Sequence, residues 1–224
     1  RLKDECTSAS AWAELSPIVE ECTPTPPLKP TAVGPRGLNH GPRAQARGKH
    51  HCSAYHFVQY VLKNNLSIMN FIDSDFAMLN QNLAEFYGIE GVKGNEFRPV
   101  SLPENQKRGG LLSQGSFLSG HSDGVQAHPI KRAVWLKEKI LGDHPPPPPP
   151  NVPELDPETP GFENLTLKEQ LFLHRNKVSC MDCHRKIDPF GVVFENYDAV
   201  GRFRLTAKDK PIDVKSILPD GTEV

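Results

Sequence analysis

Residues 166–191 read TLKEQLFLHRNKVSCMDCHRKIDPFG, and this stretch decides what kind of protein the chain can be. Thr166 and Glu169 have the spacing of a capping box and precede apolar residues, which predicts a helix leading into Cys180. Residues 180–184, Cys-Met-Asp-Cys-His, then place an imidazole directly after two thiols that are separated by two residues. This is the attachment pattern of c-type haem, in which each thiol forms a thioether with one vinyl group of the porphyrin.

Three residues of this pentapeptide carry the chemistry. Cys180 and Cys183 are predicted to attach haem c, and His184 is predicted to coordinate the iron as an axial ligand. The sixth ligand stays open, because neither Met nor His follows His184 in the sequence. His174, ten residues earlier on the preceding helix, is the candidate sixth ligand. A histidine at a helix C-terminus is also favoured by the helix dipole without any ligand role.

Other upstream side chains have simpler interpretations. Met69 and Met78 follow the apolar pattern of a helix and are expected in the core. His121 and His128 flank a loop and are expected at the surface.

Side chains near the motif could also contact a porphyrin. Phe190 and Tyr197 could cover its edge, or they could pack only against the helix that begins near Thr166. Several basic residues could pair with the haem propionates, although we expect ordinary solvated charges for most of them. These basic residues are Arg185, Lys186, Arg202 and Arg204.

Two other chemistries share the Cys-x-x-Cys spacing. A structural zinc ion needs four ligands, and the pentapeptide offers at most three from one tight loop. A thioredoxin-like thiol pair needs a long helix after the motif. We expect Pro189-Phe190-Gly191 to interrupt such a helix. Haem is therefore the favoured interpretation, with metal or thiol chemistry as alternatives.

The composition limits the remaining functions. The chain has 224 residues with 26 basic and 27 acidic side chains, so its charge does not indicate binding to nucleic acid or to an anionic membrane. No apolar run is long enough to cross a bilayer. There are 22 prolines, which predicts a large share of loop. Because the chain begins with Arg1 and ends within an apparent strand, we expect it to be a fragment of a longer protein.

The pattern of apolar residues predicts the order of elements. Residues 1–56 are rich in proline and lack periodicity, and their three cysteines fit no disulfide or metal template well; we expect this segment to be disordered or not homologous to the rest of the chain. Helices are expected from Phe57, over 71–87 with Gly88 as the C-terminal glycine, and from Gly109 to Leu118. A strand is expected over 96–102.

The second half of the chain is expected to contain one more long helix and then mostly short elements. A helix over 130–141 begins after Pro129 and ends at Gly142. Prolines 145–150 form a stiff spacer. Residues 187–191 form a turn, 194–200 a short helix, and 202–224 strands and turns with a hairpin tip at 218–221.

From Phe57 onward the chain resembles the planctomycete-type cytochrome c domain proteins, which are multidomain exported proteins of unknown role. The resemblance rests on long ungapped segments. They are residues 108–114 (RGGLLSQ), 128–132 (HPIKR) with Trp135, the proline run into 151–153, 180–189 (CMDCHRKIDP) and 195–202 (ENYDAVGR).

This resemblance implies a modular organisation. Residues 57–105 would be the end of an upstream helical module, and residues 106–204 a cytochrome c-like haem module that includes the spacer 145–150. Residues 205–224 would be the truncated start of a C-terminal module. Residues 1–56 show no resemblance. The resemblance also implies export to the periplasm or the cell exterior, where haem c is attached.

The sequence therefore predicts a mainly α fold with a cytochrome c-like helical module, irregular loops, a short β-rich C-terminal tail and a disordered N-terminal region. The predicted function is electron transfer through haem c to a partner redox protein or a neighbouring oxidative module. Two alternatives remain open. One is a structural or binding module that makes no redox use of the motif, and the other is a haem enzyme with an open sixth coordination position.

Overall fold

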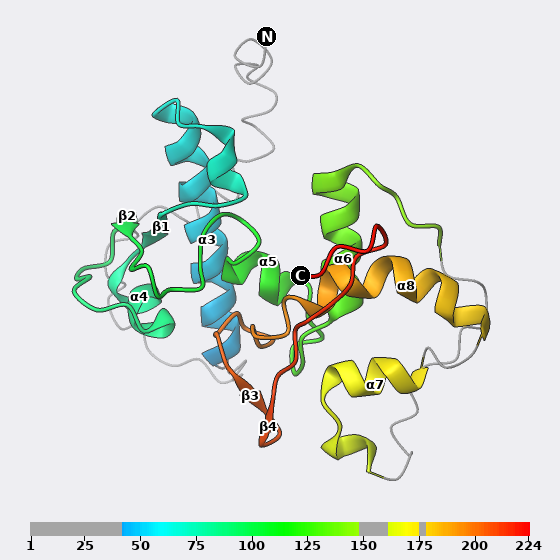
Figure 1. Ribbon diagram of the computed structural model, residues 1–224. Helices are drawn as coiled ribbons and strands as arrows, with labels where there is room; N and C mark the ends of the chain where they lie inside the picture. Colours follow the sequence, from blue (N-terminus) through cyan, green and yellow to red (C-terminus); the bar gives the residue numbers. More distant parts are fainter. Residues whose placement is uncertain (1–41, 148–160, 175–177) are drawn as a thin grey trace, which may run out of the picture. The chain divides into compact units, whose positions relative to one another are not determined.

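The fold is mainly α, as predicted (Figure 1). The computed structural model describes residues 42–147, 161–174 and 178–224. Two compact units divide between Ser116 and Phe117, within the short helix α5 (Gly115–Gly120). Each unit has its own packing and is described separately. The predicted disorder of residues 1–41 and the second half of the proline spacer, residues 148–150, lie outside the described residues.

The first unit is built on the long helix α3 (Pro42–Lys63). Phe57 and Val61, one helical turn apart, are completely buried on its inner side. The expectation that residues 42–56 lack regular structure is wrong, since they form the larger part of α3. This segment has no apolar period, but it is rich in Arg, Ala, Gln and Lys, which are strong helix formers. A short 3-10 helix, η1 (Ile68–Phe71), follows α3.

The prediction of a helix over residues 71–87 is wrong for the first part of this range and correct for the last part. Its first part is the strand β1 (Phe76–Leu79), which pairs antiparallel with β2 (Arg98–Ser101), the strand predicted over 96–102. Met78 and Leu79 are both buried but belong to different clusters, Met78 with Phe57 and Leu79 with Leu83. A strand covered on both faces gives a continuous apolar run that periodicity alone does not separate from a helix.

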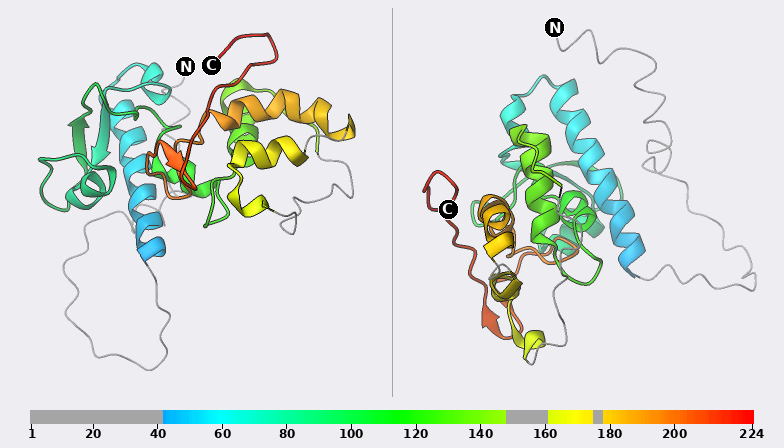
Figure 2. Two further views of the ribbon diagram at one scale, coloured as in Figure 1. Left: turned by 60° about the horizontal axis from the view of Figure 1, so that its bottom comes forward. Right: turned by 90° about the vertical axis from the view of Figure 1, so that its right-hand side faces the viewer.

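The remaining part of the predicted helix is α4 (Gln81–Tyr87). Asn80 caps its start by accepting a hydrogen bond from the Leu83 amide at 3.0 Å. Gly88 ends it with a φ of 70°, as predicted. Figure 2 shows β1, β2 and α4 on one side of α3.

The segment Arg108-Gly109-Gly110 forms a loop that fits tightly against the chain after η1. Gly110 has a φ of +64°, and a Cβ at this position would lie 2.3 Å from the carbonyl oxygen of Ile72. The Arg108 guanidinium lies over the ring of Tyr87 at 3.6 Å. The helix predicted from Gly109 therefore begins only at Gly115, since the preceding residues are committed to this contact.

The second unit contains the helix predicted after Pro129. It consists of α6 (Pro129–Leu136) and a π-helical continuation, η2 (Lys137–Leu141). His128 caps the start, and Gly142 ends it with a φ of 68°. The prediction of a helix between Pro129 and Gly142 is confirmed.

Two more helices carry the decisive stretch of sequence. They are α7 (Leu167–His174), which follows the 3-10 turn η3 (Phe162–Asn164), and α8 (Val178–Val192). The capping box is present: the Thr166 amide donates to Glu169 Oε2 at 2.6 Å, and the Glu169 amide donates to Thr166 Oγ1 at 3.3 Å. In the views of Figures 1 and 2, α7 and α8 lie side by side.

The turn predicted over residues 187–191 is wrong, because α8 continues through Pro189 to Val192. A proline within a helix removes the hydrogen bond to the carbonyl four residues earlier, here that of the exposed Arg185. The helix also gains a close packing contact. A Cβ on Gly191 would lie 2.2 Å from the carbonyl oxygen of Pro129 at the start of α6, so only glycine allows this approach.

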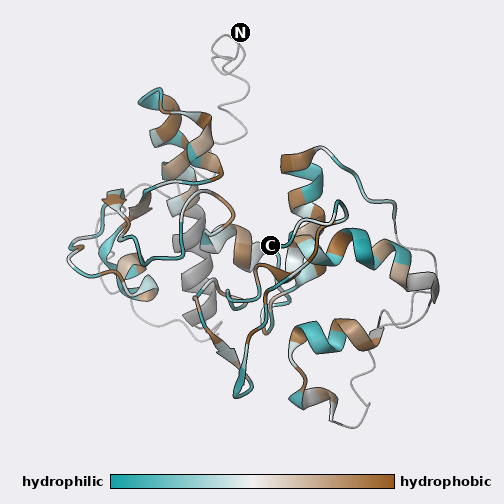
Figure 3. Ribbon diagram, viewed as in Figure 1, coloured by the Kyte–Doolittle hydropathy of each residue, from teal (hydrophilic) through white to brown (hydrophobic). Residues whose placement is uncertain are grey.

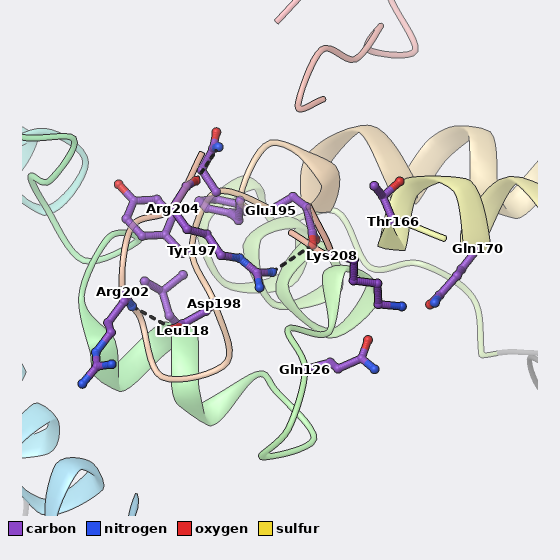
Figure 4. Close-up of polar contacts among 12 residues, drawn as sticks. Leu118, Gln126, Thr166, Gln170, Glu195, Tyr197, Asp198, Arg202, Arg204 and Lys208 are labelled. Atoms are coloured by element: carbon purple, nitrogen blue, oxygen red, sulfur yellow. Dashed lines mark hydrogen bonds and ion pairs between the residues drawn. The ribbon is translucent and has the colours of Figure 1, made fainter. Parts of the chain in front are cut away.

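The short helix predicted over residues 194–200 is also wrong, since the segment consists of turns. Backbone carbonyl groups of this segment accept hydrogen bonds from the buried guanidinium of Arg132. Arg132 Nη1 donates to the carbonyls of Phe194 and Tyr197 at 3.0 and 2.9 Å, and Nη2 donates to those of Asp198 and Leu118 at 2.8 and 3.0 Å. Arg132 is only 1% exposed. Figure 4 shows Leu118, Tyr197 and Asp198 gathered in this region.

The C-terminal residues form short extended pieces, as predicted. The two-residue strands β3 (Thr206–Ala207) and β4 (Lys210–Pro211) pair across a tight turn. A second hairpin closes at residues 218–221, where the Gly221 amide donates to the Leu218 carbonyl at 2.9 Å. In the described part of the chain, no helix combines the length and apolar character needed to cross a membrane.

Candidate haem-attachment site

The Cys-x-x-Cys-His residues lie in the first two turns of α8. Cys183 is exposed and has a free thiol. The His184 side chain is 17% exposed, and its Nδ1 lies 2.8 Å from Oδ1 of Asp188, one turn further along the helix. The Asp188 side chain is 3% exposed. For Cys180, the structure describes the position in the helix but not the side chain.

The contact with Asp188 indicates which ring nitrogen of His184 carries a proton. A carboxylate without a proton can only accept a hydrogen bond, so opposite such a carboxylate Nδ1 of His184 would carry the proton and donate it to Asp188. Nε2 is then the ring nitrogen with a lone pair. Metal-binding histidines in proteins have this arrangement, with the second ring nitrogen donating to a carboxylate or carbonyl. The residues at this site therefore fit an axial ligand to haem iron, with a solvent-accessible thiol directly beside it.

A groove of about 890 Å³ runs along a neighbouring side of α8. Its floor and walls are mainly apolar, and it lies between α7, α8 and the C-terminal hairpin. The α8 residues that line it include Met181, Arg185, Asp188 and Val192, which recur every three or four positions and so share one side of the helix. The mixed apolar and polar character of α7 and α8 is visible in Figure 3.

The groove and the thiol of Cys183 face different directions. Successive residues of an α-helix are about 100° apart around the axis, so Cys183 projects about 200° from Met181. Cys183 is absent from the residues that line the groove, whereas Asp188 belongs to them. His184 thus lies between the two sides, next to Asp188 on the side of the groove.

The two aromatic residues that were expected near a porphyrin edge, Phe190 and Tyr197, pack against other side chains of the protein. Phe190 is half-buried beneath Lys137, whose Nζ lies 4.7 Å from the ring centroid. Tyr197 is 8% exposed and packs edge-on against Phe203. Neither residue belongs to the groove.

Among the four basic residues considered for propionates, Arg185 lines the groove and pairs with Asp182 at 2.8 Å. Arg204 pairs with the buried Glu195 at 3.3 Å, as Figure 4 shows. Lys186 and Arg202 are exposed.

The candidates for a sixth ligand are dispersed. His174 is the last residue of α7, and its side chain lies outside the described part of the chain. Met78 is buried in β1, as expected for a core residue, but Met69 is 62% exposed, which contradicts the expectation that it is buried. Met69 belongs to the exposed 3-10 turn η1 rather than to an apolar helix face.

The two loop histidines have structural roles. Nδ1 of His121 lies 2.7 Å from the carbonyl of Phe117, and its ring packs against Trp135. His121 is only partly exposed, which differs from the surface position expected. His128 accepts a hydrogen bond from the amide of Lys131 as the N-cap of α6.

Within residues 42–147, 161–174 and 178–224, as far as their side chains are described, no three His, Cys, Asp or Glu side chains form a group that could hold a metal ion. Asp188 was not predicted from the sequence as a partner of His184. The signal was present, since His-x-x-x-Asp in a helix places the two side chains on the same side. It was missed because a turn was expected over residues 187–191, which would have ended the helix before Asp188.

Two ionisable side chains of the second unit, Glu195 and Arg132, are buried. Burial raises the pKa of Glu195 to about 7, against the opposing effect of Arg204 and Arg132. Burial also lowers the pKa of Arg132 to about 10. Glu195 lies in the turns that directly follow α8, and Arg132 binds the carbonyls of those turns from α6. Together they hold the segment to which the C-terminal half of α8 connects.

Two family models match parts of the chain. Residues 108–207 match PSCyt3, described as a protein of unknown function (DUF1588), and residues 9–89 match PSD4, likewise described as a protein of unknown function (DUF1592). Both are planctomycete cytochrome c-type domain families. The PSD4 match extends into residues 1–56, for which no resemblance was expected from the sequence. No curated protein and no solved structure matches the chain.

Proposed function

We propose that the segment matching PSCyt3 is a c-type haem module that transfers single electrons within an exported multidomain protein. The observation that carries this proposal is the His184–Asp188 pair beside the accessible thiol of Cys183. A histidine oriented in this way is prepared for a metal, and the Cys-x-x-Cys-His spacing is that of haem c attachment. The match to a family named as cytochrome c-like supports the same assignment.

In this proposal each residue has one task. Cys180 and Cys183 would hold haem c through thioether bonds, and Nε2 of His184 would bind the iron. Bound haem supplies one-electron redox chemistry. The α8 helix keeps the three residues in fixed relative positions, because its C-terminal half is packed against α6 through Gly191. The electrons would pass between a partner redox protein and a neighbouring oxidative module.

Export is part of the proposal. Haem c attachment takes place outside the cytoplasm, and Cys52 in the first unit is disulfide-bonded. Disulfides persist in oxidising compartments such as the periplasm and the cell exterior. Both features support a periplasmic or extracellular location.

The test is covalent haem attachment to the full 224-residue chain. The chain is exported in a host with a c-type haem maturation system and then denatured, and its intact mass is measured. We expect a mass increase of one haem that survives denaturation. Cys183→Ser should lose the double attachment, and His184→Ala should change the visible spectrum of any haem that remains. Lys186→Ala, an exposed change on the same helix, is the matched control.

A folded, exported chain without covalent haem would refute the proposal and favour a binding or structural role. Carbon monoxide binding to the reduced haem protein would indicate an open sixth position. That result would favour a haem enzyme over a simple electron carrier. The absence of Met and His after His184 in this sequence makes the measurement informative.

A further inference from the structure

Asp188 is unusual among the acidic residues of α8 because it is almost completely buried. The residue is 2% exposed, whereas Asp182 on the same helix has a side chain that is 79% exposed. A buried carboxylate forms stronger hydrogen bonds than an exposed one, because water does not compete for its oxygen atoms. Its bond to Nδ1 of His184 is 2.8 Å long. The contact is therefore both short and shielded from solvent.

The position of Asp188 is also firmly held. It precedes Pro189, and a residue before proline is disfavoured in the helical region. The helix nevertheless continues for four residues beyond Asp188, to Val192. Pro189 and Val192 are also buried, and Gly191 fixes the backbone against α6. Asp188 thus holds the His184 ring from a rigid part of the helix.

We infer that Asp188 is a positioning residue that sets the electron-donating strength of His184 toward the iron. This inference rests on the proposed function. A carboxylate that accepts the Nδ1 proton makes the imidazole a more basic ligand. A more basic axial ligand stabilises ferric iron relative to ferrous iron, so the pair holds the reduction potential low. A backbone carbonyl in the same position would have a smaller effect, since it carries no full charge.

The test compares reduction potentials of haem-loaded full-length chains. Asp188→Asn keeps the size and one hydrogen-bond acceptor but removes the charge, so the potential should shift upward. Asp182→Asn removes an equal charge at an exposed position of the same helix and is the matched control; it should cause a much smaller shift. Asp188→Glu restores a carboxylate and should return the potential toward the wild-type value.

A second measurement uses the haem-free chain. Nitrogen-15 NMR of the His184 ring should show the Nδ1–H tautomer in the wild type. In Asp188→Leu, which has no acceptor, this tautomer should lose its dominance. The NMR result separates a true hydrogen bond from a general effect of charge on the haem.

The outcomes separate the two hypotheses. Wild-type protein that acquires no haem overturns the proposed function and the inference with it. Protein that acquires haem but has the same potential in Asp188→Asn as in the wild type overturns the inference alone. Equal shifts in Asp188→Asn and Asp182→Asn, or an Nε2–H tautomer in the haem-free wild type, also overturn it.

Discussion

Replacing Arg132 by methionine should destabilise the second unit more than any surface change on the same helix. The side chain is 1% exposed and donates four hydrogen bonds of 2.8 to 3.0 Å to backbone carbonyls. Hydrogen bonds to a charged group contribute about 1.5–3 kcal/mol each, but burying the charge offsets part of this. Removing one partner from a buried ionic network typically costs about 3–5 kcal/mol. We expect a loss of that size.

The assay is urea denaturation of the full chain, followed by circular dichroism and by amide exchange in peptides covering residues 117–136 and 192–201. With a slope of about 1–3 kcal/mol per molar urea, the transition of the second unit should move down by about 2 M. Lys131→Met, the preceding and exposed residue, is the control and should change the free energy of unfolding by no more than about 0.5 kcal/mol. Equal transitions for Arg132→Met and Lys131→Met would refute the reasoning.

Three further predictions test the packing. Gly191→Ala should cost about 1–3 kcal/mol, because its new methyl group meets the backbone of α6, whereas Gly120→Ala, with open space around it, should be neutral; thermal denaturation compares them. The raised pKa of Glu195, from 4.5 to about 7, means that the folded state retains a proton that the unfolded state releases. Stability should therefore fall between about pH 4.5 and 7 by at most about 3 kcal/mol, and Glu195→Gln should reduce this slope in denaturation curves measured across that range; an unchanged slope would contradict the burial argument. Asn80→Ala should cost the first unit about 1 kcal/mol through loss of the α4 cap, measured by urea denaturation; an unchanged midpoint would show that the cap contributes little.

Local signals in the sequence predicted several elements correctly. The Thr166–Glu169 capping box, Pro129 at the first position of α6 and the terminating glycines at positions 88 and 142 are all present. Each of these depends on neighbours only a few residues away, so the sequence contains the whole interaction. The hairpin tip at residues 218–221 is of the same kind.

Elements that depend on distant partners were predicted less well. Residues 194–200 have a helix-like apolar pattern, but their carbonyls bind Arg132, more than 60 positions away. Pro189 normally indicates a helix end, yet the contact between Gly191 and Pro129 keeps α8 intact. In β1, the strand is buried on both faces by separate clusters, and no periodicity distinguishes it from a helix.

The candidate site shows the same division. The spacing of Cys180, Cys183 and His184 indicates a chemistry without any knowledge of the fold. The role of Asp188 does not follow in the same way, because it depends on α8 continuing past residue 187 and on the burial of a carboxylate. Both properties arise from packing against other elements.

The two ends of α8 differ in what they contact. Its described contacts with α6 and η2 fall near Phe190 and Gly191, whereas Cys183 is exposed toward the other end of the helix. The helix can therefore be packed into the second unit while the thiol of Cys183 remains open to solvent. A reagent that modifies Cys183 would therefore meet a helix that is already folded, and its reaction would leave the core of the unit covered.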